Sequence, residues 1–315
     1  MKTQKQKLIV ILGPTASGKS ELALKLAKKF KGEIISADSR QIYKGLDIGT
    51  GKPSPVQLEL VKHHLIDIVD PAEKYSAGKF ARDASAVARK LSGQGKTILI
   101  CGGTGFYIEA LIRPFFKEPA SGEEEKIKLR LRMKQKAEAE GTESLYQELS
   151  AIDPQSARRL HPNDFQRVSR ALELYYLTGQ TMTELLSCPH GESPYAPFSV
   201  ILEPERESLK RAIACRCQSM FERGWAEEVE ALLKADISPD APGMQSLGYR
   251  EVIAMVRGKI SRDQALALVI QKTWQYARRQ YIWFNRRPAH IRGNPGTLPA
   301  ERIVSLWRTH SARFS

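Results

Sequence analysis

The chain has 315 residues, of which 42% are hydrophobic, so it is too long for one minimal domain. This length predicts one large core with a smaller appended or inserted unit. No stretch approaches the roughly 18 uninterrupted apolar residues of a membrane helix, which excludes such a span, and no membrane partner is expected. Forty-nine Lys and Arg against 35 Asp and Glu give a net charge of +14. This charge suggests a polyanionic partner, although simple solubility explains it equally well.

Residues 1–116 alternate between predicted strands and predicted helices. The first apolar run, Leu8–Leu12, follows a basic start as in a signal peptide, but it leads straight into a glycine loop. We therefore expect a first strand there and a cytoplasmic protein. The expected strands are Lys7–Leu12, Ile34–Ile35 and Thr97–Cys101, and the expected helices are Ser20–Phe30 and Ala81–Leu91. This alternation indicates the α/β class, with a parallel sheet flanked by helices.

Residues 117–198 have the pattern of an all-helical insertion. Two stretches rich in Pro, Gly and charge bound it and are typical of linkers, Lys117–Glu125 and Cys188–Phe198. The helices predicted between them are Lys126–Glu140, a short one near Ser144–Ser150, and Phe165–Leu177. The apolar strand Ser199–Leu202 then returns the chain to the sheet. Long helices are expected after it, at Ser208–Arg223, Ala226–Lys234 and Arg262–Arg286.

These patterns predict four segments, and the net charge differs between the insertion and the parts of the chain that flank it. They are the first part of the core (1–116), the helical insertion (117–198), the return to the core (199–290) and a tail (291–315). Residues 1–116 hold 19 basic and 10 acidic side chains, and 199–315 hold 19 and 12, an excess of +9 and +7. The insertion holds 11 and 13, a net −2. The positive field is therefore expected on the two flanking segments.

Cysteine and histidine give no metal-site pattern. The four cysteines have no partner pair at zinc-finger spacing, so reduced thiols are expected at Cys101, Cys188, Cys215 and Cys217. His63 and His64 open a strand with no ligand nearby and are interpreted as structural.

A phosphate-binding loop follows the first strand. Its sequence fits G-x-x-x-x-G-K-[ST] between a strand and a helix, with the residues Gly13, Pro14, Thr15, Ala16, Ser17, Gly18, Lys19 and Ser20. Glycines let backbone N–H groups turn inward around phosphate oxygens, and the helix N-terminus adds its dipole. Lys19 neutralises charge and Ser20 is placed to ligate Mg²⁺. The motif predicts a P-loop NTPase-like sheet that binds a di- or triphosphate. It does not distinguish ATP from another di- or triphosphate.

The second predicted strand ends in a polar cluster that includes Asp38 and Ser39. The carboxyl ends of parallel strands form the ligand cleft, so a carboxylate there suits a base acting on an acceptor. A helix N-cap explains Asp38 equally well. A generic ATPase is disfavoured, because the best candidate for a metal-binding Asp ends the expected apolar strand Leu65–Asp70 and is followed at once by Pro71.

Seven blocks of the sequence resemble, in order, those of the tRNA dimethylallyltransferases of bacterial type. They are Gly13–Ser20, Ser36–Pro53, His63–Ser76, Gly102–Leu111, Asn163–Gly179, Leu247–Glu251 and Tyr276–Phe284. The resemblance implies transfer of a dimethylallyl group from dimethylallyl diphosphate to N6 of the adenosine 3′ to the anticodon of tRNA. An adenylate isopentenyltransferase acting on free AMP, ADP or ATP resembles the N-terminal blocks too and is the alternative. A monomer with Mg²⁺ as cofactor is expected.

The resemblance also implies roles for single residues. Thr15–Ser20 match the diphosphate cradle, Asp38 matches the general base, and Arg216 matches an arginine that reaches the diphosphate, with Arg211 as the alternative. The first group that matches tRNA-contacting positions is Asp38, Ser39, Arg40, Gln41, Thr104, Gln166, Arg167, Val168, Ser169 and Arg170. The second is Gln245, Ser246, Leu247, Gly248, Tyr249, Arg250, Arg278, Arg279, Gln280, Tyr281, Ile282, Trp283, Phe284 and Asn285.

The last of these positions fall in the predicted helix Arg262–Arg286, whose periodicity indicates that one face packs in the core. Apolar residues recur every three to four positions and predict a core stripe of Leu266, Ile270, Trp274, Ala277, Tyr281 and Phe284. Arg279, Trp283 and Arg286 share another face, and basic and aromatic side chains together suit splayed RNA bases.

Overall fold

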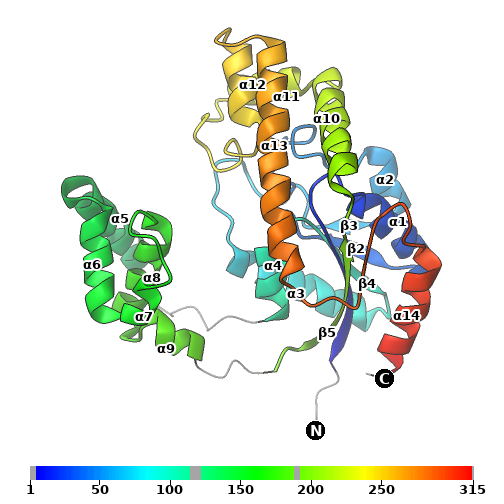
Figure 1. Cartoon of the computed structure of the whole chain (residues 1–315), viewed down its shortest axis with the longest axis horizontal. Coiled ribbons are helices and arrows are strands. Elements are labelled where there is room, and N and C mark those ends of the chain that lie inside the picture. Colours follow the sequence, from blue (N-terminus) through cyan, green and yellow to red (C-terminus); the bar gives the residue numbers. More distant parts are fainter. Residues whose placement is uncertain (1–4, 114–121, 188–191, 314–315) are drawn as a thin grey trace. The chain divides into compact units, whose positions relative to one another are not determined.

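The computed structural model describes residues 5–113, 122–187 and 192–313. They belong to two compact units, one formed by Met1–Arg113 with Ser193–Ser315 and the other by Pro114–Glu192. The first, called the sheet unit here, contains the β-sheet, and the second, called the helical unit, contains only helices among its described residues (Figure 1). The predicted boundary between residues 116 and 117 lies outside the described residues.

The sheet unit is built on six parallel strands in the order β3-β2-β4-β1-β5-β6. Their bounds are β1 Gln6–Leu12, β2 Glu33–Ser36, β3 His63–His64, β4 Ile98–Cys101, β5 Tyr195–Leu202 and β6 Ile291–Gly293. Parallel sheets are covered on both faces, which is why runs such as Leu8–Leu12 are buried without alternation. The predicted α/β class with a parallel sheet is confirmed.

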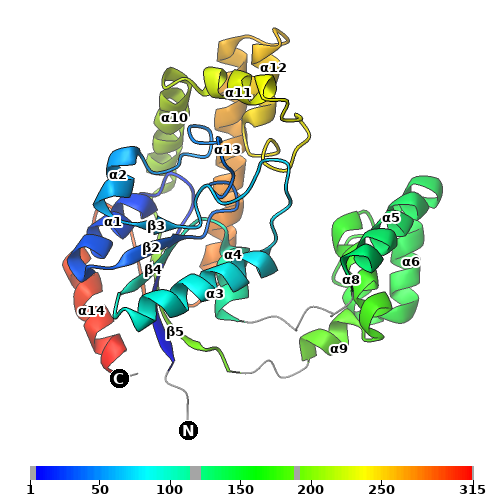
Figure 2. The ribbon, with the colours of Figure 1, turned by 180° about the vertical axis from the view of Figure 1, so that it is seen from behind.

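Helices cover both faces of the sheet (Figures 1 and 2). On one face, α1 (Lys19–Phe30) and α14 (Ala300–Ala312) pack Leu26 and Trp307 against Ile9 and Leu99. On the other face, α3 (Ala77–Gly93) and α4 (Gly105–Ile112) bury Phe80, Ala84, Tyr107 and Ile108 against Leu8, Val10 and Ile100. The short α2 (Pro55–Leu60) begins with a capping box made by Ser54 and Gln57.

A further core lies beyond the strand ends and is formed by four helices. These are α10 (Arg206–Glu222), α11 (Trp225–Lys234), α12 (Tyr249–Val256) and α13 (Arg262–Asn285). Trp225 and Tyr249 are fully buried in it, with ring centroids 5.5 Å apart. Ile42 and Leu46, from the loop after β2, pack into the same core. This packing fixes the loop that carries part of the site described below.

The helical unit has its own core. It contains α5 (Glu123–Glu140), α6 (Thr142–Ile152), α7 (Pro154–Ala157), α8 (Phe165–Thr178) and α9 (Met182–Ser187). Met133, Leu145, Leu149, Val168 and Leu172 are buried together between them. The three helices predicted for this segment correspond to α5, α6 and α8, whereas α7 and α9 are too short to give a periodic pattern.

Strand β5 begins at Tyr195, so the prediction of a linker to residue 198 and a strand from residue 199 is wrong. Pro197 caused the error, because proline cannot donate to a ladder and is typical of strand edges. Here the neighbouring β6 pairs only with Val200–Leu202, which leaves Pro197 paired with β1 alone. A proline is tolerated at such a half-paired position.

Two further expectations about local structure are corrected. Leu65–Asp70 is not a strand, because Leu65 and Asp67 have left-handed backbone angles, with φ of 62° and 55°. Asp70 caps a turn through Ala72 N, at 2.9 Å. Residues 291–315 are not a tail within their described part, since β6 joins the sheet and Ile303 and Trp307 of α14 are buried.

The core stripe of α13 is shifted by one residue at four of its six predicted positions, while Ala277 and Phe284 are as predicted. The buried side chains are Ala265, Val269, Thr273, Ala277, Gln280 and Phe284. Leu266, Ile270 and Trp274 are only partly buried, and Tyr281 is exposed. The apolar pattern missed this face because two of its members, Thr273 and Gln280, are polar and are buried through hydrogen bonds.

Candidate active site

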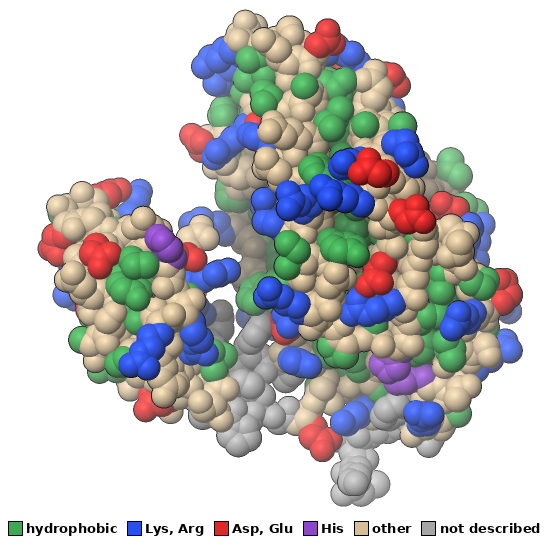
Figure 3. All heavy atoms as spheres, in the orientation of Figure 1, with side chains coloured by type: hydrophobic (Ala, Val, Ile, Leu, Met, Phe, Trp, Pro, Cys, Tyr) green, Lys and Arg blue, Asp and Glu red, His purple; other side chains and the backbone are tan. Residues whose placement is uncertain are grey.

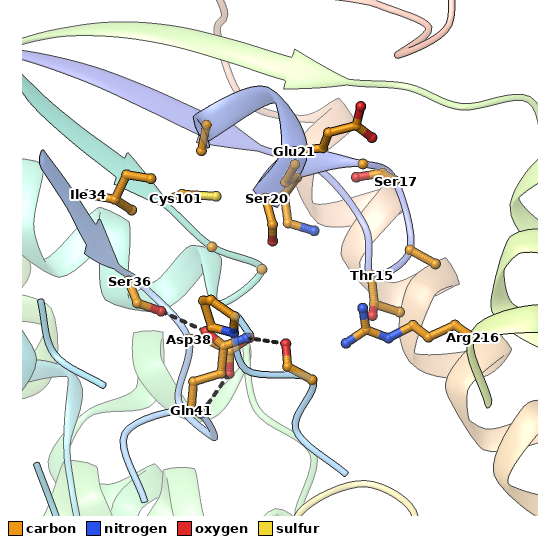
Figure 4. A pocket seen from close by; sticks show the side chains of 18 of the residues that line it. Thr15, Ser17, Ser20, Glu21, Ile34, Ser36, Asp38, Gln41, Cys101 and Arg216 are labelled. Atoms are coloured by element: carbon orange, nitrogen blue, oxygen red, sulfur yellow. Dashed lines mark hydrogen bonds between the residues drawn. The ribbon is translucent and has the colours of Figure 1, made fainter. Parts of the chain in front are cut away.

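A cleft of about 170 Å³ opens at the carboxyl ends of β1, β2 and β4 (Figure 4). The loop after β1 forms one wall, the end of β2 with the following loop forms another, and Arg216 of α10 with Tyr276 and Gln280 of α13 closes it. The strand order reverses at β1, with β4 on one side and β5 on the other, and ligands of open α/β sheets bind at such a point.

The loop Gly13–Ser20 is shaped for an anion. Gly13, Ala16 and Gly18 have positive φ of 152°, 60° and 80°. A Cβ at Gly13 would lie 2.9 Å from Ser17 Oγ, so only glycine fits the fold of the loop there. Among the described residues, the buried Ser17 hydroxyl has no hydrogen-bond partner. A buried polar group normally has a partner, so this one fits a ligand oxygen.

Lys19 is held above the loop. Its ammonium group donates a hydrogen bond of 2.6 Å to the backbone oxygen of Pro14. Burial lowers the pKa of Lys19 to about 8, and the cation of Arg216 acts in the same direction while Asp38 opposes it. A buried ammonium beside a second cation is stabilised by a bound anion.

Asp38 lies at the end of β2 but precedes no helix, so the alternative of a helix N-cap is wrong. Its Oδ1 instead accepts hydrogen bonds from Arg40 N at 2.8 Å and Gln41 N at 3.4 Å, which close a turn. Both of these hydrogen bonds go to Oδ1, and within the described residues Oδ2 accepts none. Oδ2 is the atom available for a proton.

Arg216 enters the cleft from α10, facing the side where Asp38 lies (Figure 4). Burial lowers the pKa of Arg216, while Asp38 opposes that shift. A Cβ at Gly51, whose φ is 63°, would lie 2.0 Å from Arg216 Nη2. Arg211 is exposed and does not line the cleft. Of the two arginines considered, the structure therefore brings Arg216 to the phosphate loop.

Some residues of the cleft were missed from the sequence. Cys101 ends β4 and Tyr276 lies one turn before Gln280 on α13. Burial raises the pKa of Cys101 to about 11, and burial together with Asp38 raises that of Tyr276 to about 12, so both stay neutral. The position of Cys101 at a strand end was a usable signal. Tyr276 opens the block Tyr276–Phe284, but the apolar periodicity of its helix gave no sign that its side chain enters the cleft.

Glu228 of α11 fixes the loop that carries Gly51. Its carboxylate accepts hydrogen bonds from the backbone N–H groups of Asp47, Ile48 and Gly49, at 2.7, 2.6 and 3.2 Å. The hydroxyl of Tyr249 donates to the same carboxylate at 2.7 Å. The three backbone donors tie this loop to Glu228, and the hydroxyl of Tyr249 anchors the carboxylate in the core formed by α10–α13.

We expect Glu228→Gln to lower the free energy of unfolding by about 1.5–3 kcal/mol, because hydrogen bonds to a charged group are lost and an amide N–H faces backbone donors. Urea unfolding measures the change. Glu227→Gln is the matched control, since Glu227 is the exposed neighbour on the same helix. Equal stabilities of the two variants would show that the Glu228 carboxylate does not hold the loop.

The residues matched to tRNA contacts after β2 and β4 lie beside the cleft. Thr104 Oγ1 accepts a hydrogen bond from Ser39 N at 3.0 Å. Arg40 donates to the backbone oxygen of Pro242 at 3.1 Å, which ties this loop to the segment before Gln245. Gln41 bridges Ser36 and the backbone oxygen of Gly51. Asp38, Ser39, Arg40 and Gln41 thus form one connected rim of the cleft.

The other positions matched to tRNA contacts divide by burial. The exposed or half-exposed side chains are Gln166, Arg167, Ser169, Arg170, Gln245, Leu247, Arg250, Arg278, Arg279, Tyr281, Ile282, Trp283 and Asn285. The buried positions are Val168, Ser246, Gly248, Tyr249, Gln280 and Phe284. Side-chain contact with a macromolecule does not fit Val168, Tyr249 and Phe284, because they are packed in the hydrophobic cores. The side chains of Ser246 and Gln280 are instead held by hydrogen bonds to backbone groups of loops. In the helical unit, Arg170 pairs with Glu173 at 3.2 Å and Arg167 with Asp164 at 3.5 Å.

Comparison with known proteins identifies the family of the chain. Residues 41–287 match the family model described as IPP transferase. The chain is 44% identical to tRNA dimethylallyltransferase 2 of Geotalea uraniireducens and 43% identical to the tRNA dimethylallyltransferase of Geobacter sulfurreducens. The first alignment covers 90% of both chains, and the second covers 90% of this chain and 91% of the relative.

Solved structures give the same result. The tRNA isopentenylpyrophosphate transferase of Bacillus halodurans is 32% identical with a TM-score of 0.70, over 98% of this chain and 97% of that one. A eukaryotic dimethylallyltransferase, solved acting on tRNA, is 26% identical with a TM-score of 0.80, over 98% of this chain and 77% of that one. The predicted resemblance and the P-loop NTPase-like fold are confirmed. The chain belongs to the tRNA dimethylallyltransferase family, whose family model is that of the IPP transferases.

Proposed function

We propose that this chain transfers a dimethylallyl group from dimethylallyl diphosphate to N6 of the adenosine 3′-adjacent to the anticodon in tRNA. The observation that carries the proposal is the cleft itself, which brings the carboxylate of Asp38, the guanidinium of Arg216 and the phosphate loop with Lys19 together. An anion cradle facing a carboxylate suits a reaction in which a diphosphate leaves and a proton is removed. The membership of the chain in the family supports the same reaction.

On the donor side, the C1–O bond of dimethylallyl diphosphate breaks and negative charge grows on the diphosphate. The backbone N–H groups of the phosphate loop, Lys19 and Arg216 are arranged to stabilise that charge. The free hydroxyl of Ser17 offers one more hydrogen bond. The allyl system spreads the partial positive charge left on carbon, which lets a weak nucleophile attack it.

On the acceptor side, N6 of adenine is a poor nucleophile because its lone pair is delocalised into the ring. As the N6–C1 bond forms, the nitrogen must lose a proton, and Asp38 Oδ2 is placed to accept it. The rim around Ser39, Arg40 and Gln41 is proposed to hold the flipped-out base. Holding both substrates in line makes the reaction effectively unimolecular.

The site fits Mg²⁺ held mainly by the diphosphate. Among the described residues, no group of three His, Cys, Asp or Glu side chains could hold a metal alone. Magnesium is commonly bound by few protein oxygens together with substrate phosphates, and Ser20 supplies a hydroxyl in the cleft. When bound, the ion would neutralise charge on the leaving diphosphate.

The test is mass spectrometry of nucleosides from unmodified tRNA incubated with the protein, Mg²⁺ and dimethylallyl diphosphate. Dimethylallyladenosine in the tRNA is the expected product, and free AMP, ADP and ATP in parallel reactions are expected to stay unmodified. Prenylation of the free nucleotides alone would instead indicate the adenylate enzyme. The similarity to proteins named tRNA dimethylallyltransferases disfavours that alternative.

The proposed tRNA surface of the sheet unit combines cations with aromatic rings. Figure 3 shows Lys and Arg side chains gathered over α10 and α13 on the face in view. Arg287 lies over Trp283, with 4.3 Å to the ring centroid, and Arg279 lies over Tyr276 at 5.9 Å. Such pairs suit unstacked bases and phosphates of RNA.

We expect tRNA affinity to fall at least about tenfold between roughly 50 and 200 mM salt. Lys and Arg side chains that bind the RNA phosphates release the counterions held there, and added salt opposes that release. Arg279→Ala should weaken binding and lower the slope of log affinity against log salt by about one. Arg302→Ala is the control, since Arg302 is equally exposed but lies on α14. Filter binding at several salt concentrations measures both. A constant affinity across that range would contradict an electrostatic surface.

We also propose that the protein acts in the cytoplasm, where its substrate tRNA is found. Within the described parts of the chain, no helix is long and apolar enough to cross a membrane. The monomeric state stays a prediction, which sedimentation at several protein concentrations would test.

A further inference from the structure

Gln280 is a polar side chain buried between two loops of the site. It is only 6% exposed, although it belongs to a helix whose outer face is charged. Its Oε1 accepts a hydrogen bond from the backbone N–H of Thr15 at 2.8 Å, and its Nε2 donates to the backbone oxygen of Gly103 at 2.9 Å. One amide therefore joins the phosphate loop to the loop after β4.

The first hydrogen bond sets the orientation of the peptide between Pro14 and Thr15. A planar trans peptide points its N–H and C=O in opposite directions. With the N–H of Thr15 directed at Gln280, the oxygen of Pro14 points to the other side, where it accepts the hydrogen bond of 2.6 Å from Lys19. The amide of Gln280 thus determines, through one peptide, where the ammonium of Lys19 rests.

The second hydrogen bond reaches the other half of the site. Gly103 precedes Thr104, whose hydroxyl oxygen holds the backbone N–H of Ser39 at 3.0 Å. Ser39 follows Asp38 directly. A Cβ at Gly103 would lie 2.5 Å from Gln280 Nε2, so glycine lets the amide approach this loop closely. Gln280 is consequently connected to both the donor side and the base side of the cleft.

We propose that Gln280 is a positioning residue that orients the Pro14–Thr15 peptide, and with it Lys19, relative to the loops that support Asp38. The inference rests on the proposed function and assigns Gln280 a role other than the matched tRNA contact, because its amide is already hydrogen-bonded to two loops of the protein. Because a misplacement of about 1 Å can cost on the order of a hundredfold in rate, the role has a measurable size.

Gln280→Met tests the role with a side chain of similar length and no hydrogen bonds. We expect the single-turnover rate with saturating tRNA and dimethylallyl diphosphate to fall by about a hundredfold. Calorimetry with inorganic diphosphate should show about tenfold weaker binding, since one of the groups that position the loop is lost. The affinity for tRNA should not change. Gln275→Met, the same substitution at an exposed position of α13, is the control and should match the wild type.

Gln280→Glu provides a readout that a purely structural role would not give. A protonated carboxyl can accept from Thr15 and donate to Gly103, but a carboxylate cannot donate. The rate of this variant relative to the wild type should therefore be near one at low pH and fall as pH rises. The ratio removes the contribution of the titratable groups of the cleft that both proteins share, namely Lys19, Glu21, Asp38, His63, Cys101, Arg216 and Tyr276.

The outcomes separate this inference from the proposed function. A Gln280→Met protein that loses tRNA affinity but keeps diphosphate affinity would overturn the positioning role, as would a pH-independent ratio for Gln280→Glu. If the wild type failed to prenylate tRNA, the proposed function would fail. The comparison of inorganic diphosphate binding between the wild type and Gln280→Met would still decide the role of Gln280.

Discussion

Asp38→Asn is expected to keep the fold and the binding of both substrates while slowing the chemical step by about a hundred- to ten-thousandfold. Asparagine retains the oxygen that accepts hydrogen bonds from Arg40 and Gln41, so the turn after β2 survives. An amide cannot take the proton of N6. Single-turnover rates with saturating tRNA, together with thermal midpoints, measure the two effects separately.

Asp38→Ala is the companion variant, because it removes the turn-capping oxygen as well as the base. It should lose activity like Asp38→Asn and, in addition, lose about 1 kcal/mol of stability. If Asp38→Asn turned over at nearly the wild-type rate and only Asp38→Ala were impaired, the carboxylate would be structural. The diphosphate itself would then be the proton acceptor to examine.

Lys19→Ala is expected to lower the rate of prenyl transfer by about a hundred- to a thousandfold, the usual cost of losing one group that stabilises charge in the transition state. Lys19 donates a hydrogen bond to the backbone oxygen of Pro14 in the phosphate loop. Its loss should therefore weaken diphosphate binding and slow the transfer step. Affinity for tRNA should be nearly unchanged, because tRNA binds over a wide basic surface. Filter binding and single-turnover rates provide the comparison.

Lys25→Ala is the matched control for this experiment. Lys25 lies on the same helix, α1, is 63% exposed and pairs only with the neighbouring Glu21 among the ion pairs described. Its replacement should change neither rate nor affinity. If Lys19→Ala lost tRNA affinity as severely as activity, the loop would be part of the RNA surface instead of the donor site.

The sequence predicted the elements whose pattern is local. The strand predicted at Lys7–Leu12 contains the apolar run Leu8–Leu12 ended by glycine, and it forms β1 within one residue of its predicted bounds. The phosphate loop was recognisable because its glycines stand at fixed spacing, where the backbone of the loop requires positive φ. Asp38 was found because strand ends mark the cleft, although its turn-capping role could not be told from an N-cap without the backbone.

What could not be predicted depends on contacts between distant residues. Gln280 contacts Thr15 across 265 positions of the chain, and an apolar periodicity gives no sign of a buried amide. Three of the four donors on Glu228 likewise come from a loop about 180 residues earlier. Strand β6 has three residues, and it is a strand because β5 offers it an edge.

The split of the sheet unit by the helical unit has a consequence for synthesis on the ribosome. Strand β1 pairs with β4 and with β5, and β5 begins at Tyr195. Until β5 has emerged, one edge of β1 stays open. The phosphate loop after β1 lacks Arg216 and Gln280 for longer still, because both follow β5 in the chain. The helical unit is contiguous in the chain and rich in local contacts, so it is expected to fold first. The nascent protein therefore passes through a stage with a folded insertion and an incomplete sheet, which is when a chaperone that covers open strand edges would matter most.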